Sequence, residues 1–69
     1  MDYVLLGKRV RYVRRMLDIM QKELAKETGV SVALIGHVER GTRIPSVETV
    51  YRICKALGLS ADYLLGLDE

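Results

Sequence analysis

The sequence predicts an all-α domain of five short helices, and three observations support this fold class. Apolar residues recur at spacings of three and four, which is the period of an amphipathic helix. Gly29, Gly41, Gly58 and Gly66 each follow such a segment, at the place where a residue with positive φ commonly ends a helix. No segment alternates between apolar and polar residues as a half-buried strand does.

The first helix is expected from about residue 3 to 17. One apolar stripe runs along it, with spacings of four, three and four residues, formed by Leu6, Val10, Val13 and Leu17. The second helix is expected over about 21 to 28, where QKELAKET would bury Leu24 and Ala25.

Serines mark the starts of the next three helices. Ser31, Ser46 and Ser60 each precede an apolar-periodic segment, where a hydroxyl can accept a hydrogen bond from an unpaired backbone N–H. The predicted helices cover about 31 to 40, 46 to 57 and 60 to 65. Their expected inward residues are Ile35 and Val38 in the third, Val47, Val50, Ile53, Cys54 and Leu57 in the fourth, and Leu64 and Leu65 in the last.

A chain of 69 residues makes one small domain, 1–69, with a thin core, since a domain of this size buries only roughly 60% of its unfolded surface. Cys54 and His37 are the lone cysteine and histidine. We therefore expect no internal disulfide, no zinc site and no cofactor, and we expect Cys54 to pack in the core. Oligomerisation remains open as a source of stability.

Charge is distributed unevenly along the chain. KRVRYVRR (8–15) holds five basic residues and no acid, although the net charge is only +2. One positive face is expected, and a solvated helix face without a partner explains such a cluster equally well. The start, MDYVLLGKRV, does not resemble a signal peptide, and no stretch approaches the roughly 20 apolar residues of a membrane span. We expect a cytoplasmic protein with no membrane contact and no small-molecule ligand.

The second and third helices form a predicted helix-turn-helix with its core at 21–40. Only a few residues around Gly29 join them, and so tight a connection makes the helices cross steeply. The spacing of five residues fits this motif: Gln21, Ala25, Gly29, Ile35 and Val38. Arginine, lysine and helix N-termini attract phosphate regardless of sequence.

With ERG at 39–41 and PSVETVYRICKALGLSADYLL following, nearly the whole chain from Leu6 to Gly66 resembles the Cro and lambda-repressor-like helix-turn-helix family, also called the XRE family. The resemblance implies a compact five-helix DNA-binding domain. It also implies that the third helix enters the major groove of duplex DNA, that the N-terminus of the second points at a phosphate, and that two subunits bind a palindrome.

The resemblance also assigns roles to residues of this chain. Gln21 would contact a phosphate and the groove. Val32, Ala33 and His37 would face base edges and flanking phosphates, and Ser31, at the start of the third helix, belongs to the same expected DNA-binding set. Beyond the third helix, Arg40, Thr42 and Arg43 would meet the DNA backbone. Arg14 and Glu39 match a pair that forms a structural salt bridge between the first and third helices of relatives.

Two departures from the family pattern bear on DNA recognition. Met20 stands where relatives usually have Ser or Thr, so a helix cap worth about 1 kcal/mol and its phosphate contact are lost. Val32, Ala33 and Gly36 cannot hydrogen-bond a base through their side chains. We therefore expect apolar contacts with thymine methyl groups, and we expect Gly36 to let the helix backbone approach the DNA closely. Hydrogen bonds to bases would come from His37 and Gln21, and DNA shape would supply the rest of the specificity.

The leading interpretation is a transcription regulator, a repressor, that binds double-stranded DNA as a homodimer, with recognition helices about 34 Å apart. No residues form a catalytic constellation, so an enzyme is not expected. The expected dimer surface is apolar and near the C-terminus, formed by Tyr63, Leu65 and Leu67. The alternative is a protein-interaction or antitoxin-like module that uses the same fold with weak DNA specificity and docks through its apolar third helix.

Overall fold

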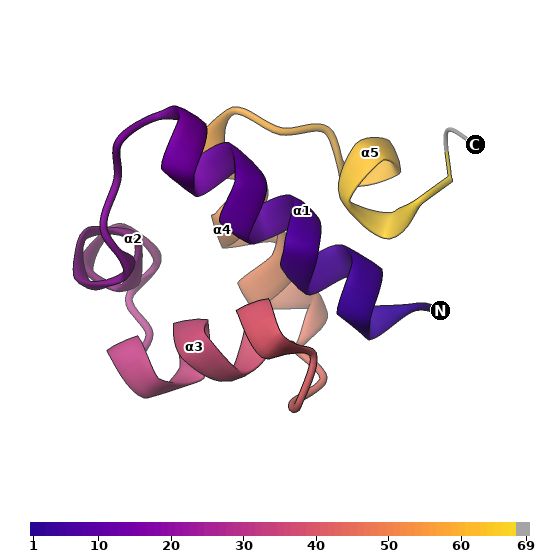
Figure 1. Cartoon of the computed structure of the whole chain (residues 1–69), viewed down its shortest axis with the longest axis horizontal. Coiled ribbons are helices and arrows are strands. Elements are labelled where there is room, and N and C mark those ends of the chain that lie inside the picture. Colours follow the sequence, from indigo (N-terminus) through magenta and orange to yellow (C-terminus); the bar gives the residue numbers. More distant parts are fainter. Residues whose placement is uncertain (68–69) are drawn as a thin grey trace.

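The computed structural model describes residues 1–67, and within them it contains five helices and no strand, which confirms the all-α fold class (Figure 1). The helices are α1 (Tyr3–Met16), α2 (Gln21–Thr28), α3 (Val32–Arg40), α4 (Val47–Leu57) and α5 (Ala61–Leu65).

The helix ends follow the capping chemistry in the sequence. The hydroxyls of Ser31, Ser46 and Ser60 each accept a hydrogen bond from the N–H three residues later, at 3.0–3.1 Å. Asp2 caps α1 in the same way, a role that the sequence reading did not assign. At the start of α2, Met20 supplies no side-chain acceptor, and its own N–H donates to Glu23 Oε1 at 3.1 Å. The four predicted glycines end α2 to α5 with φ between 68° and 74°.

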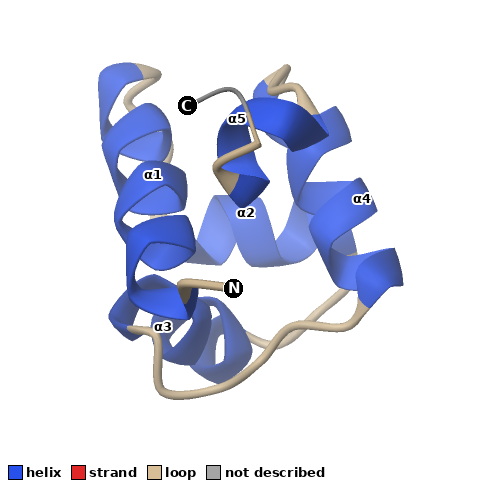
Figure 2. Cartoon of the chain, turned by 90° about the vertical axis from the view of Figure 1, so that its right-hand side faces the viewer, coloured by secondary structure: helices blue, strands red, loops and turns tan. Residues whose placement is uncertain are grey.

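The helices pack around one small core (Figure 2). α1 packs against α3 and also contacts α4 and α5, while α2 contacts α3 and α4. All five helices contribute fully or nearly fully buried side chains, which are Leu6, Val10, Leu24, Ala25, Ile35, Val38, Ile53, Cys54, Leu57 and Leu64.

Two expected core residues are exposed, and both lie at helix ends. Leu17 is 50% exposed because α1 stops at Met16, and Ile19 packs against the core instead. Val47, the first residue of α4, is 88% exposed. Pro45 and Thr49 take the buried places around that turn, so the apolar period that holds for the rest of α4 fails at its first residue.

The closest contact between α1 and α3 depends on Gly7, which the sequence reading left without a role. A Cβ built at Gly7 would lie 2.2 Å from the carbonyl oxygen of Val38 and 2.6 Å from that of Glu39. Only a residue without a side chain allows α1 to approach the backbone of α3 so closely. This contact sets the position of α3, the helix that carries the candidate site.

Candidate nucleic-acid interface

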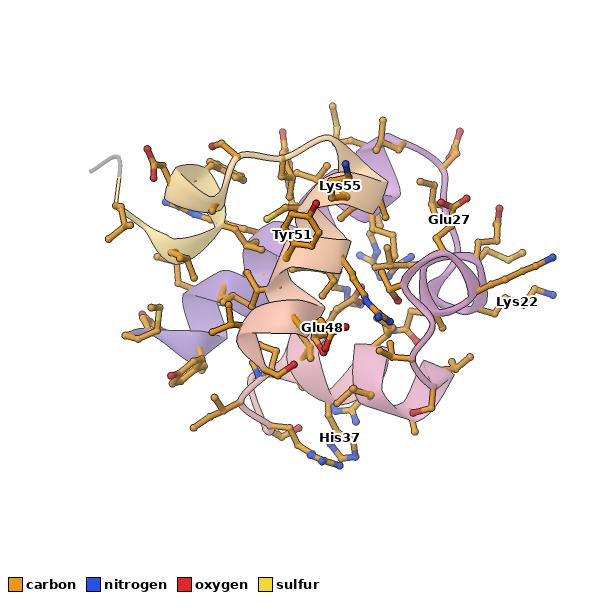
Figure 3. The ribbon with its side chains drawn as sticks, turned by 180° about the vertical axis from the view of Figure 1, so that it is seen from behind. Lys22, Glu27, His37, Glu48, Tyr51 and Lys55 are labelled. Atoms are coloured by element: carbon orange, nitrogen blue, oxygen red, sulfur yellow. The ribbon has the colours of Figure 1, made fainter. Side chains whose placement is uncertain are left out.

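One side of α3 faces the core and the other faces outward. Ile35 and Val38 are 0% and 1% exposed. We call the outward set the recognition face; it consists of Val32, Ala33, His37 and Arg40. Val32 is 46% exposed, Ala33 and Arg40 are exposed, and His37 is half-buried. Figure 3 shows His37 pointing away from the other helices.

An ion pair joins the inner side of α3 to α1. Arg14 Nε and Nη2 lie 2.6 and 3.0 Å from the two carboxylate oxygens of Glu39, and Nη1 donates to the carbonyl of Ile19 at 2.8 Å. The two side chains are only 10% and 2% exposed. The hydrogen bond to Glu39 raises the pKa of Arg14, so the guanidinium stays charged. The expected pairing of these two residues is therefore present in the structure.

Gln21 belongs to the same network. Its Nε2 donates to Glu39 Oε1 at 3.0 Å, and the side chain is half-buried. Glu39 thus ties α3 to both α1 and the first residue of α2. The resemblance gave Gln21 a phosphate and groove contact; in this structure its amide nitrogen holds the helix-turn-helix together.

The end of α3 is held by local hydrogen bonds. His37 Nδ1 lies 2.9 Å from Thr42 Oγ1, and that hydroxyl also lies 3.2 Å from the carbonyl of His37. Gly41 ends the helix with φ of 73°, and a Cβ there would meet Val4 at 2.9 Å. Thr42 and Arg43 follow in an exposed loop. Two side chains expected to face DNA therefore fix each other's orientation.

Gly36 is not the open backbone that the sequence led us to expect. It is buried, and the guanidinium of Arg40 lies against it, since a Cβ at Gly36 would be 3.0 Å from Arg40 Nη1. In this structure the Arg40 guanidinium therefore covers the backbone at Gly36, and a close approach of that backbone to DNA stays a prediction. A basic residue four positions after a helical glycine was the signal in the sequence. Ser31, also expected near DNA, uses its hydroxyl as the cap of α3.

The five basic side chains of the segment 8–15 do not form one surface, because they make different contacts. Arg14 is in the buried pair, and the guanidinium of Arg9 lies 4.6 Å from the ring centre of Tyr63. The remaining cations line a hollow of about 480 Å³ on α1, formed by Lys8, Arg11, Tyr12, Arg15 and Met16. No residue of α3 lines this hollow.

One of the three expected dimer residues, Leu65, lines an apolar hollow. Tyr63 and Leu65 are half-buried, and Leu67 is 67% exposed. Leu65 and Val47 help to line a hollow of about 180 Å³, whose other walls are Met1, Tyr3, Leu6, Pro45 and Val50. Ile44, in the preceding loop, is 69% exposed.

Other kinds of site find little support in the described residues. Between residues 1 and 67, no three His, Cys, Asp or Glu side chains gather as metal ligands. Burial raises the pKa of the Cys54 thiol, which disfavours the reactive thiolate. None of the helices in this part of the chain is both long and apolar enough to cross a membrane.

Comparison with known proteins also points to the helix-turn-helix fold. The model of the helix-turn-helix family HTH_3 matches residues 10–64. The uncharacterized HTH-type transcriptional regulator YazB of Bacillus subtilis is 36% identical over 64 residues, which are 93% of each chain. Repressor protein C2 of Salmonella phage P22 is 42% identical over 65 residues, but these are 94% of this chain and only 30% of the repressor.

Two solved structures have closely similar folds. The restriction-modification controller protein C.AhdI of Aeromonas hydrophila superimposes with a TM-score of 0.87 at 32% identity, covering 91% of this chain and 96% of the controller. The P22 c2 repressor, solved in complex with a synthetic operator, gives a TM-score of 0.84 at 42% identity, covering 87% of this chain and 91% of the solved one.

Proposed function

The chain belongs to the helix-turn-helix family HTH_3, and from that premise we propose that it regulates transcription by binding a specific sequence of duplex DNA as a homodimer. One observation carries the proposal: the inner side of α3 is fixed to α1 and α2 through Glu39, while its outer side is left to solvent. Such a helix can enter a major groove without rearrangement of the fold.

Phosphate contacts hold the domain on DNA in this proposal. Arg43 and Thr42 lie in the exposed loop that follows α3, where they flank a helix seated in the groove. Cationic contacts of this kind fix the position of the protein on the duplex but carry no sequence information. Val32 and Ala33 contribute contacts with thymine methyl groups, because apolar side chains at this face match the apolar edge of thymine.

The dimensions of the domain support a homodimer. Its longest dimension is 29 Å, whereas successive turns of the major groove on one side of DNA lie about 34 Å apart. Two copies are therefore needed to place two α3 helices in adjacent grooves. In this proposal the dimer surface is apolar and consists of Ile44, Val47, Leu65 and Leu67; Val47 and Leu65 line the hollow at the start of α4. Tyr63 was also expected at the dimer surface, but the guanidinium of Arg9 lies over one face of its ring.

Repression by occupancy is the simplest action for such a dimer, which would block a promoter by binding to it. Selection of bound sequences from a random DNA pool tests the proposal. We expect a palindrome whose half-sites are centred about 10 base pairs apart. Recovery of no common sequence would contradict specific binding.

A protein-interaction module of the same fold is the alternative function, favoured by the apolar side chains on the recognition face. Salt dependence separates the two functions. A DNA complex that neutralises several phosphates loses affinity with a log-log slope of about −0.9 per phosphate. An apolar docking surface would hardly respond to salt, so a flat titration would favour the alternative.

A further inference from the structure

We propose that Arg40 recognises a guanine, with its guanidinium donating two hydrogen bonds to O6 and N7 in the major groove. This inference rests on the proposed DNA-binding function and extends it. Arg40 lies at the end of α3, and this position alone would suggest a contact with the DNA backbone. The inference gives Arg40 a role in sequence recognition instead.

The conformation of Arg40 places its donors over the middle of α3. Side chains on a helix lean toward its N-terminus, and so cover the preceding turn. The Arg40 guanidinium follows this rule: a Cβ at Gly36 would lie 3.0, 3.6 and 3.7 Å from its Nη1, Nη2 and Cζ atoms. The group therefore lies one turn back along the helix, beside the recognition face, and not beyond the end of α3.

Gly36 makes this conformation possible. A glycine inside a helix weakens it, because the unfolded glycine has more conformational freedom to lose. Here the missing side chain leaves the space in which the planar guanidinium lies close to the helix backbone. A Cβ at position 36 would make the guanidinium shift by a few tenths of an ångström, and a larger side chain would move it further.

Arg40 is available to an external acceptor. Its side chain is exposed, and within residues 1–67 it makes no hydrogen bond or ion pair. This distinguishes it from Arg14, whose donors are used by Glu39 and Ile19, and from Arg52, which bonds Glu48 and the carbonyl of Thr28.

The chemistry of the recognition face also points to guanine. Val32 and Ala33 offer no donor, so the hydrogen-bond donors near them come from His37 and Arg40. Guanine presents two neighbouring acceptors in the major groove, and the planar fork of an arginine matches both at once. Adenine and thymine each present only one acceptor there, so the same arginine discriminates against them.

The test uses the full chain and the sequence that it selects from random DNA. Affinity is measured for every base pair at each half-site position, with the wild type, Arg40→Ala, Gly36→Ala and Arg43→Ala. We expect one position per half-site where the wild type prefers G·C by roughly 5-fold to 100-fold. Arg40→Ala should lose that preference, and Gly36→Ala should reduce it. Arg43→Ala should lower affinity for all sequences alike.

Changing a single atom of the DNA tests directly whether Arg40 binds guanine. Substitution of 7-deazaguanine for the preferred guanine removes the N7 acceptor, and should weaken wild-type binding several-fold without affecting Arg40→Ala. Arg15→Ala, which removes an exposed arginine of α1 instead, is the control and should keep the G·C preference. If Arg40→Ala weakened every sequence equally, Arg40 would be a phosphate contact and the inference would be overturned. If the wild type selected no sequence at all, the proposed function would fail as well.

Discussion

Glu39 accepts hydrogen bonds from residues on two other helices, and its removal should have a large effect on stability. Glu39→Ala would leave the buried charge of Arg14 and the amide of Gln21 without their acceptor. Breaking one partner of a buried ion pair costs about 3 kcal/mol or more. We therefore expect the melting temperature to fall by more than about 10 °C in a domain of this size.

Glu27→Ala is the matched control for this prediction. Glu27 is exposed on α2, so its loss should change stability by no more than about 0.5 kcal/mol. Equal melting temperatures for the two variants, measured by circular dichroism, would show that the Arg14–Glu39 pair is not a structural link.

Contacts between Val32 or Ala33 and thymine are testable at the level of a methyl group. Replacing thymine with uracil at a contacted position removes one methyl, worth about 0.8 kcal/mol, or about fourfold in affinity. We expect this loss for the wild type in a fluorescence-anisotropy titration. The Val32→Ser variant should respond less to the replacement. Unchanged wild-type affinity for uracil-containing sites would exclude methyl recognition.

Among the helices, three glycines should respond to alanine in three different ways. Gly7→Ala places a Cβ against backbone atoms of α3 that cannot move away, so we expect a loss of about 3 kcal/mol. Gly58→Ala meets open space but has φ of 68°, which costs about 1 to 2 kcal/mol. Gly36→Ala meets only the movable end of Arg40, and the better helix former should gain up to about 1 kcal/mol.

Denaturant unfolding of the three variants measures these differences. The predicted order of stability is Gly36→Ala above the wild type, then Gly58→Ala, then Gly7→Ala. If Gly7→Ala were as stable as the wild type, the close approach of α1 to α3 would not determine the position of the recognition helix.

The helices themselves were largely predictable because their signals are local. Serine caps and terminal glycines act within one turn, so the sequence alone located four helix ends and three starts correctly. Leu17 and Val47 were assigned wrongly because burial of a helix end depends on which elements extend over it. The spacing of apolar residues along a helix does not show which other elements cover its ends.

The fine structure of the candidate site was predictable only in part, for the same reason. The Arg14–Glu39 pair was expected from the resemblance, but the bond from Gln21 to Glu39 depends on how α2 crosses α3. The rotamer of Arg40 over Gly36 depends on a choice among side-chain conformations that the sequence leaves open. Long-range packing and rotamers therefore had to come from the structure.

At the scale of the whole molecule, the proposed dimer can be separated from the fold of one subunit. Val47→Asp places a charge on a side chain that is 88% exposed, at the first residue of α4. An acid near a helix N-terminus is favourable, so the monomer should remain folded. We expect sedimentation equilibrium to show at least a tenfold weaker dimer.

Met20→Asp is the control for the dimer surface, because it adds the same charge at another exposed helix start. It should leave self-association unchanged. A Val47→Asp protein that associates as strongly as the wild type would place the dimer interface elsewhere on the molecule.

Whether the outer side of α3 contacts DNA is decided by comparing the DNA affinities of two variants, Ala33→Glu and Ala61→Glu. Both alanines are exposed in the first turn of a helix, α3 and α5 respectively, so both variants should fold and carry the same net charge. If the outer side of α3 enters the groove, Ala33→Glu faces the phosphates and should lose roughly 100-fold in affinity, while Ala61→Glu stays within about twofold of the wild type. Equal affinities of the two variants for the selected DNA would contradict the account.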